Sequence, residues 1–202
     1  MLTALLLVGG YLCGSLPTGE WFAHQAGVDV RRAGSGNVGA TNVARTAGAS
    51  AGALPLFADV AKGLVPTLFA AQLAPVTAGD HWRIAAVGLS AFLGHVYPIF
   101  SRFSGGKGVA TAFGAFLILA PLAAAAGALM FLLVAFSTRY VSVASMLGAL
   151  TLAVCAVPLK YPMDVRAAGF AAAAIILWRH RANLARLRTG QEPKFSFRGQ
   201  VK

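Results

Sequence analysis

Long apolar segments with very few charges are the feature that most restricts how this chain can fold. The longest covers residues 108–137, thirty positions without a charged side chain, although about twenty apolar residues are enough to cross the hydrocarbon core of a bilayer. Over the whole chain only 11% of residues are charged, compared with about 25% in typical soluble domains. Since helices satisfy their backbone hydrogen bonds internally in lipid, the sequence predicts an all-α integral membrane protein with one domain, residues 1–202.

Hydropathy also predicts where the membrane helices lie. No basic region precedes the first apolar core, so the N-terminus is expected to be a first membrane helix and not a cleaved signal peptide. Gly14, Pro17 and Gly19 are expected to distort this helix. Loops are expected over residues 28–50 and 75–83. Besides the long run, predicted spans cover residues 2–25, 51–74, 84–100, 143–157 and 167–178.

The number of times that residues 108–137 cross the membrane decides the topology. Two crossings, turning near Pro121, place thirteen Lys and Arg residues on one side and three on the other, whereas one crossing divides them almost equally, seven and nine. Because basic residues concentrate in cytoplasmic loops, we predict a seven-transmembrane helical bundle with the N-terminus outside and the C-terminus cytoplasmic. Residues 193–202 are expected to form a flexible basic tail. The net charge of +11 is then explained by topology and by contacts with membrane lipids, and no nucleic-acid partner is expected.

Asp59, Lys62 and His95 are ionisable residues inside predicted helices. Asp59 and Lys62 are three positions apart on one helix face. They are expected to form an internal salt bridge, or alternatively to support an active site from below. A single charge at the centre of a span costs about 2.5–3.5 kcal/mol, which pairing would reduce. His95 is expected to be a hydrogen-bonded structural group, with a catalytic role as the alternative.

A polar run punctuated by glycines, residues 34–45, stands out in this apolar chain. It reads Gly-Ser-Gly-Asn-Val-Gly-Ala-Thr-Asn-Val-Ala-Arg. Glycine allows the backbone to approach a ligand closely and to adopt positive φ. Backbone N–H groups, hydroxyls and a guanidinium together can bind a phosphate or a carboxylate. The run is therefore a candidate anion site.

Two further polar clusters follow. In residues 100–111, three glycines surround Lys107 just before an apolar helix, an arrangement that favours anion binding. The spacing does not match a Walker A loop, and a flexible glycine turn with an interfacial lysine is the alternative. Residues 179–192 place His180 and Asn183 on one helix face. A basic amphipathic segment lying on lipid head groups would explain the arginines there, but not the His–Asn pair or the lone glutamate.

The ionisable residues exclude several kinds of chemistry. Only six carboxylates occur, so paired-acid hydrolysis and carboxylate-bound metal sites are not expected, and no metal or cofactor is predicted. The seven-span topology places all three polar clusters on one side of the membrane. They suit a phosphorylated substrate at the membrane surface. A transporter of a small phosphate ester or anion is the alternative function.

Four motifs in order along the chain resemble those of the bacterial acyl-phosphate:glycerol-3-phosphate acyltransferases, the PlsY family. The run at residues 34–45 is one of them. Gly-His-x-x-Pro-x-Phe at 94–100 is followed by Gly-Gly-Lys-Gly-Val-Ala-Thr at 105–111. Arg-His-x-x-Asn-x-x-Arg-Leu-x-x-Gly-x-Glu occupies 179–192, and Asp-x-x-Lys-Gly at 59–63 also fits. The resemblance covers nearly the whole chain.

The resemblance implies an enzyme of the bacterial inner membrane with seven spans and an active site that faces the cytoplasm. The enzyme would move a fatty acyl group from acyl phosphate to the 1-hydroxyl of glycerol 3-phosphate. The products would be lysophosphatidic acid and phosphate, in the first step of phospholipid synthesis. Its partners would be glycerol 3-phosphate, acyl phosphate and membrane lipids, and a monomer is compatible with the sequence.

The resemblance also implies roles for single residues. The predicted catalytic residues are Ser35, Arg45, Lys107, His180 and Asn183. The predicted substrate-binding residues are Gly34, Gly36, Asn37, Thr41, Asn42, Gly105, Gly106, Gly108 and Glu192. The glycines and the lysine of the second loop would bind glycerol 3-phosphate, and the glutamate would maintain the integrity of the site.

These roles are consistent with the chemistry of an acyl phosphate, which is an activated mixed anhydride. The enzyme mainly needs to hold two phosphates close together and to direct a hydroxyl at a carbonyl. Direct transfer is therefore expected, with Arg45 and Lys107 supplying positive charge and backbone N–H groups stabilising the oxyanion. His180 is the candidate base, and the phosphate of the acyl donor is the alternative proton acceptor. Ser35 is less favoured as a covalent nucleophile because no base lies near it in the sequence.

Overall fold

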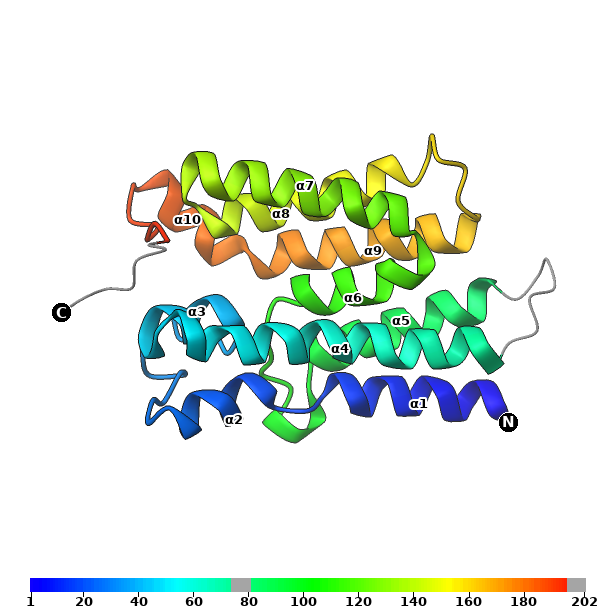
Figure 1. Ribbon diagram of the computed structural model, residues 1–202, viewed down its shortest axis with the longest axis horizontal. Coiled ribbons are helices and arrows are strands. Elements are labelled where there is room, and N and C mark those ends of the chain that lie inside the picture. The colour runs from blue at the N-terminus through cyan, green and yellow to red at the C-terminus, as the bar shows by residue number, and fades with distance from the viewer. Residues whose placement is uncertain (74–80, 196–202) are drawn as a thin grey trace.

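A computed structural model describes residues 1–73 and 81–195, and within these ranges every regular element is a helix. Most of the helices run along one long axis (Figure 1). Residues 75–80 of a predicted loop and residues 196–202 of the predicted tail lie outside the described residues. The elements are α1 (Leu2–Gly14), α2 (Thr18–Gln25), α3 (Ala40–Ala47), α4 (Ala49–Leu73), α5 (His81–Val96), the 3₁₀-helix η1 (Ile99–Ser101), α6 (Val109–Leu119), α7 (Pro121–Thr138), α8 (Val141–Cys155), α9 (Met163–Arg179) and α10 (Arg181–Arg188).

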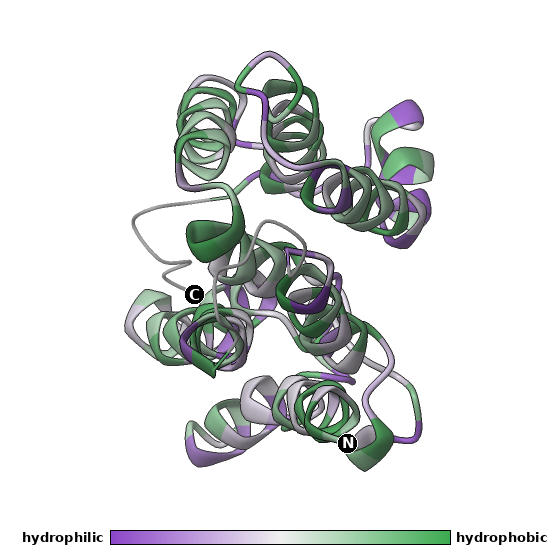
Figure 2. Cartoon of the chain, turned by 90° about the vertical axis from the view of Figure 1, so that its right-hand side faces the viewer, coloured by the Kyte–Doolittle hydropathy of each residue, from purple (hydrophilic) through white to green (hydrophobic). Residues whose placement is uncertain are grey.

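The helices form two groups that α6 joins (Figures 1 and 2). Helices α1, α4 and α5 pack together in one group, and α7, α8 and α9 pack together in the other. Helix α6 contacts both α4 and α7, and α5 contacts α9. The N-terminus lies at one end of the bundle, while α2, α3 and α10 lie toward the other end.

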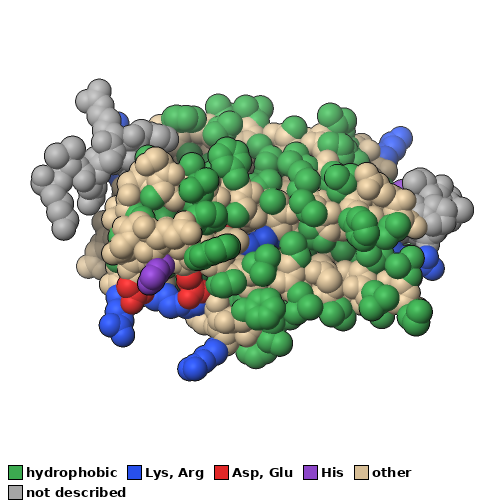
Figure 3. All heavy atoms as spheres, turned by 60° about the horizontal axis from the view of Figure 1, so that its bottom comes forward, with side chains coloured by type: hydrophobic (Ala, Val, Ile, Leu, Met, Phe, Trp, Pro, Cys, Tyr) green, Lys and Arg blue, Asp and Glu red, His purple; other side chains and the backbone are tan. Residues whose placement is uncertain are grey.

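The outer surface of the bundle is apolar. Within the described ranges, four helical segments are long and apolar enough to cross a membrane, and α6 and α8 are shorter apolar helices. Large side chains such as Phe69, Leu133 and Phe136 are exposed on the outside, where lipid would surround them. Figure 3 shows hydrophobic side chains over most of one face, with the acidic and several basic side chains gathered toward one end. These features confirm the predicted all-helical integral membrane protein.

The helix breaks expected at glycine and proline residues are confirmed. The first apolar segment is divided between α1 and α2 at residues 15–17. The long apolar run is divided at Ala120, and Pro121 begins α7, where its missing N–H costs no helical hydrogen bond. Helices α6 and α7 run in opposite directions (Figure 1). The run therefore forms two helices, of which α6, with 11 residues, extends only roughly 16 Å.

Glycines determine how closely α6 approaches α4. A β-carbon on Gly63 would collide with the carbonyl oxygen of Thr111, and one on Gly114 would collide with that of Val60. Small residues allow membrane helices to pack backbone against backbone. This contact fixes α6, and with it the glycine loop that leads into its first turn.

The prediction of a continuous loop over residues 28–50 was wrong from Ala40 onward, because α3 occupies the second half of that segment. Residues 40–47 contain neither glycine nor proline, and their apolar face packs against α4. Gly52 of α4 lies so close to Ala44 that a β-carbon there would collide with it. The polar composition of the segment concealed this amphipathic helix, which carries Arg45.

Candidate functional site

All three polar clusters line one cavity of about 500 Å³. Its polar part is formed by residues that are far apart in the chain: Ser35, Asn37, Thr41, Arg45, Lys107, His180, Asn183, Arg186 and Glu192. Its apolar part lies among α4, α6, α7, α8 and α9: Phe57, Phe113, Phe116, Phe131, Leu152 and Ile176. The structure therefore brings the predicted clusters together and joins them to an apolar crevice.

The first polar run is a loop held by the helix that follows it. The Nδ2 of Asn42 donates hydrogen bonds to the carbonyl oxygens of Val30 and Ala33, at 3.1 and 3.0 Å. Its Oδ1 accepts a bond from the backbone N–H of Ser35 at 2.9 Å. Gly34 permits this bend with φ +59°. The amide of Asn42 is thus engaged with the loop, while the Ser35 residue is exposed at the cavity.

The second loop places Lys107 between glycines at the start of α6. The backbone N–H of Gly106 donates to the carbonyl oxygen of His95 at 3.2 Å, and a β-carbon on Gly106 would collide with the Nε2 of that histidine. Gly108 has φ +80° and is the N-terminal cap of α6. The Nζ of Lys107 donates to the Oδ1 of Asn183 at 2.5 Å. The loop is therefore built on His95, and its lysine reaches the third cluster.

Buried charges lie behind the second loop. Asp59 and Lys62 are both buried, with 2.9 Å between Nζ and Oδ1, so the predicted internal salt bridge is confirmed. The same carboxylate oxygen lies 3.5 Å from the Nδ1 of His95 and accepts a hydrogen bond from Thr18 at 3.0 Å. These contacts agree with a structural role for His95. They also extend the site, because Asp59 and His95 line the cavity.

His180 sits at the junction of α9 and α10 and is almost fully buried. Its Nδ1 lies 2.8 Å from the carbonyl oxygen of Ile176. A carbonyl can only accept a hydrogen bond, so Nδ1 carries the proton and Nε2 keeps a free lone pair. Burial, together with the charge of Lys107, lowers the pKa of His180 to about 4. The imidazole is therefore neutral at neutral pH.

A chain of hydrogen bonds ties the rest of the third cluster together. The Nδ2 of Asn183 donates to the Oε1 of Glu192 at 2.6 Å, and the Nε of Arg186 donates to its Oε2 at 2.8 Å. Hydrogen bonds, chiefly from Asn183, outweigh burial and lower the pKa of Glu192. This glutamate thus bonds to other site residues, as expected of a group that maintains the integrity of the site.

Positive charge dominates the polar part of the cavity. Burial, together with the charges of nearby arginines such as Arg186 and Arg45, lowers the pKa of Lys107 to about 8. Burial also lowers the pKa of Arg45. A bound anion would relieve the repulsion among these cations. The arrangement is therefore suited to a substrate with more than one negative charge.

Three residues that line the cavity were not among the predicted site residues: Arg186, His95 and Asp59. For His95 and Asp59 a role at the active site was only the alternative. The motifs Gly-His and Asp-x-x-Lys-Gly contain these two residues, but the spacing of the motifs along the chain did not indicate that the residues would meet. The roles of the predicted catalytic and substrate-binding residues stay predictions.

Known proteins share both the sequence and the fold of this chain. Residues 4–190 match the family model described as glycerol-3-phosphate acyltransferase. The glycerol-3-phosphate acyltransferase of Geobacter sulfurreducens is 46% identical, over 96% of this chain and 99% of that protein. The crystal structure of PlsY in its glycerol 3-phosphate form superimposes with a TM-score of 0.91 at 39% identity, covering 97% of this chain and 96% of that one. The lysophosphatidic acid form gives a TM-score of 0.88 at 38% identity, with the same coverage. A family model that spans nearly all of the chain, close relatives of the same length and a matching fold agree with the suggested resemblance: this chain belongs to the glycerol-3-phosphate acyltransferase family.

Proposed function

We propose that this protein transfers a fatty acyl group from an acyl phosphate to the 1-hydroxyl of sn-glycerol 3-phosphate, giving lysophosphatidic acid and phosphate. The observation that carries the proposal is the single cavity that joins a cationic end to an apolar crevice. A substrate with both a phosphate and an acyl chain matches such a cavity. The two similar PlsY crystal structures, a glycerol 3-phosphate form and a lysophosphatidic acid form, support the acceptor and the product.

The two substrates meet where the polar and apolar parts of the cavity join. The glycine loop around Lys107 binds the phosphate of glycerol 3-phosphate. Ser35 and Arg45, from the first loop and α3, bind the phosphate of the acyl donor. The acyl chain lies in the apolar part, beside residues such as Phe116 and Leu152. This arrangement keeps two anions close together without strong repulsion because cations surround them.

The transfer itself is a direct displacement at the acyl carbon. The 1-hydroxyl oxygen bonds to the carbonyl carbon, the bond from that carbon to the phosphate oxygen breaks, and phosphate leaves with its electron pair. The hydroxyl proton passes to the leaving phosphate. His180 is a weak base, since its pKa is about 4, whereas a phosphate monoester has a second pKa of about 6. His180 then accepts a hydrogen bond at Nε2 and orients a substrate hydroxyl.

The transfer takes place at the cytoplasmic face of the bacterial inner membrane, in a bundle of seven spans with the N-terminus outside. The supporting observation is the reversal at Pro121, after which α7 runs opposite to α6 (Figure 1). With an odd number of passes the two termini lie on opposite sides. Single cysteines at residues 2 and 188, labelled from each side of intact spheroplasts, would test this topology. Labelling of both from the same side contradicts it.

The alternative, a transporter, has less support. Transport would need polar residues that continue across the membrane from the cationic end of the cavity. Instead, most of the residues that line the rest of the cavity are apolar, although Asp59, His95, Ser142 and Ser145 also line it. Asp59 and Lys62 are bonded to each other.

The acyl donor is tested with purified protein in detergent or lipid mesophase. Glycerol 3-phosphate is supplied with palmitoyl phosphate or, in parallel, with palmitoyl-CoA, and lysophosphatidic acid and released phosphate are measured. We expect product from palmitoyl phosphate only, in equal amounts with phosphate. Product from palmitoyl-CoA alone would contradict the proposed donor.

A further inference from the structure

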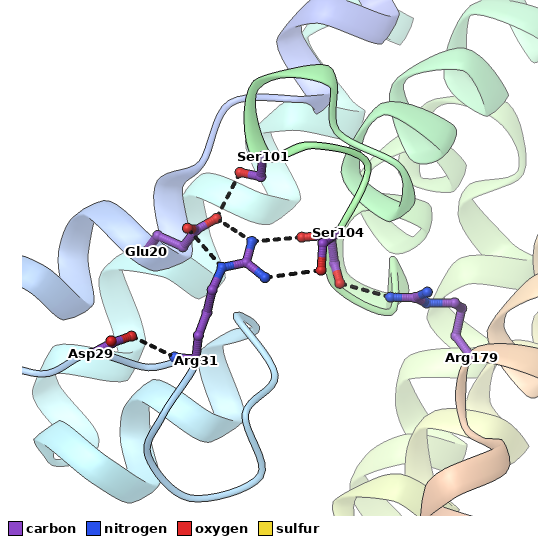
Figure 4. Close-up of polar contacts among 7 residues, drawn as sticks. Glu20, Asp29, Arg31, Ser101, Ser104 and Arg179 are labelled. Carbon is purple, nitrogen blue, oxygen red and sulfur yellow. Dashed lines mark hydrogen bonds and ion pairs between the residues drawn. The ribbon is translucent and has the colours of Figure 1, made fainter.

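Arg31 lies outside the predicted site, yet it bonds to two other segments of the chain (Figure 4). Its Nε donates to the Oε2 of Glu20 at 3.0 Å, and its Nη2 donates to the Oε1 at 2.9 Å. Such a bidentate pair fixes the plane and the direction of the guanidinium. Because Glu20 belongs to α2, this ion pair attaches the side chain of Arg31 to α2.

The remaining hydrogen bonds of Arg31 reach the second glycine loop. Its Nη2 donates to the carbonyl oxygen of Ser104 at 2.7 Å, and its Nη1 contacts the Oγ of the same residue at 3.1 Å. Ser101 also donates to the Oε1 of Glu20 at 2.8 Å. The residue after Ser104 is Gly105, which starts the Gly-Gly-Lys-Gly segment. Arg31 and Glu20 therefore fix the backbone at the entrance to this segment.

A second arginine holds the next carbonyl from the opposite side. The Nη2 of Arg179, at the end of α9, donates to the carbonyl oxygen of Gly105 at 2.8 Å (Figure 4). Two consecutive carbonyls are thus held by one arginine from the loop before α3 and another from the end of α9. Glycine backbones have more freedom than any others, so this loop needs such external contacts to keep one conformation.

Arg31 also connects the two substrate loops. It is four residues before Ser35 and belongs to the loop that Asn42 holds. The distance between the Ser35 loop and the Lys107 loop therefore depends on a contact between residues that are 73 positions apart. If that contact were lost, the distance between two phosphates bound to these loops would change.

We propose that Arg31 is a positioning residue, which holds the segment from Ser104 to Lys107 in the conformation that binds a phosphate monoester and sets its distance from Ser35. The proposal rests on the proposed function, because it takes this segment as the binding site of glycerol 3-phosphate. Glu20 orients Arg31, and its own contact with Ser101 strengthens the restraint.

The test compares three changes at this contact. Arg31→Gln removes the guanidinium, and Arg31→Lys keeps the charge without the bidentate geometry. The double change Glu20→Arg with Arg31→Glu keeps an ion pair, but the introduced carboxylate cannot donate to the carbonyl of Ser104. Arg32→Gln is the matched control: Arg32 is the neighbouring residue, its side chain is 89% exposed, and it pairs only with the exposed Asp29 among the interactions seen.

Four quantities are measured for each variant: the affinity for glycerol 3-phosphate in the absence of acyl donor, kcat, KM for each substrate, and Tm. We expect Arg31→Gln to weaken the affinity for glycerol 3-phosphate about tenfold, with a smaller change in KM for acyl phosphate. Arg31→Lys should be intermediate. The charge swap should stay impaired although its Tm recovers, and Arg32→Gln should match the wild type.

Full recovery of the affinity in the charge swap would overturn the proposal, since an ion pair alone would then suffice. A lower Tm of Arg31→Gln with unchanged affinity and kinetics would overturn it as well. Because the affinity is measured without acyl donor, a wild-type protein that binds glycerol 3-phosphate but forms no product contradicts only the proposed function. A wild-type protein that does not bind glycerol 3-phosphate overturns both.

Discussion

The two glycine-containing loops of the cavity are held in different ways. The first loop is held locally by Asn42, which bonds to three backbone groups within twelve residues of itself. The second loop is held mainly from a distance. Arg31 bonds to Ser104 and Arg179 bonds to the carbonyl oxygen of Gly105, whereas His95, which supports Gly106, is only eleven residues away.

The difference shows two ways in which a protein can order a flexible loop for anion binding. A local support is made by residues of the same segment as the loop. A distant support makes the loop sensitive to the packing of the helices that carry it. We therefore expect changes at the second loop to affect acceptor binding selectively, and changes at the support of the first loop to affect turnover.

The largest effect on activity is expected when the cation that each loop region contributes is removed. Arg45→Ala and Lys107→Ala should each lower kcat/KM by about a thousandfold, because loss of a group that stabilises developing negative charge costs about this much. The measurement is lysophosphatidic acid formation from palmitoyl phosphate, with Tm as the control for folding. Wild-type turnover in either variant would remove that residue from the site.

Gly106→Ala tests the packing of the second loop against His95. The added β-carbon would collide with the Nε2 of His95, so the loop must shift, and we expect KM for glycerol 3-phosphate to rise about a hundredfold. The KM for acyl phosphate should change much less. Gly9→Ala is the control, because a β-carbon at Gly9 of α1 meets nothing within 4 Å. An equal loss for both substrates would argue against a separate acceptor loop.

Asn42→Ala tests the local support of the first loop. It removes the bonds to Val30, Ala33 and Ser35 and leaves buried carbonyl oxygens without donors, which destabilises a protein by about 1–3 kcal/mol for each unsatisfied group. We expect kcat to fall about tenfold as Ser35 loses its position, with the affinity for glycerol 3-phosphate preserved. A selective loss of acceptor affinity would show that the two loops are not held independently.

The smallest expected effect is a pH dependence at Lys107. Its pKa of about 8 lies below the usual value for lysine of about 10.4, so the charge is present below pH 7 and is lost as the pH rises through 8. The affinity of the free enzyme for glycerol 3-phosphate should therefore fall about fourfold between pH 7 and pH 8.5. Lys107→Arg should abolish this dependence, because arginine stays protonated. The same fall with pH in that variant would assign it to another group.

Several features of this protein follow from the sequence by itself. The apolar runs determined that it is a helical membrane protein, since backbone polar groups in lipid must be satisfied within each segment. Pro121 and the residues around Pro17 determined helix breaks, because proline has no N–H and a fixed φ. The glycines and cations of the three clusters indicated anion chemistry, and the spacing of Asp59 and Lys62 indicated their salt bridge. All of these depend on interactions over a few residues.

Only the tertiary structure decided how the clusters meet. The bond from Lys107 to Asn183 joins residues 76 positions apart, and the contact of Arg31 with Ser104 joins residues 73 apart. The amphipathic helix α3 depends on its packing against α4, so the polar composition of its segment indicated a loop instead. Chain proximity does not encode such contacts, because the packing of distant helices brings the residues together. The kinds of residue at the site can therefore be predicted from short segments of the sequence, whereas their arrangement in space depends on how the helices of the bundle pack.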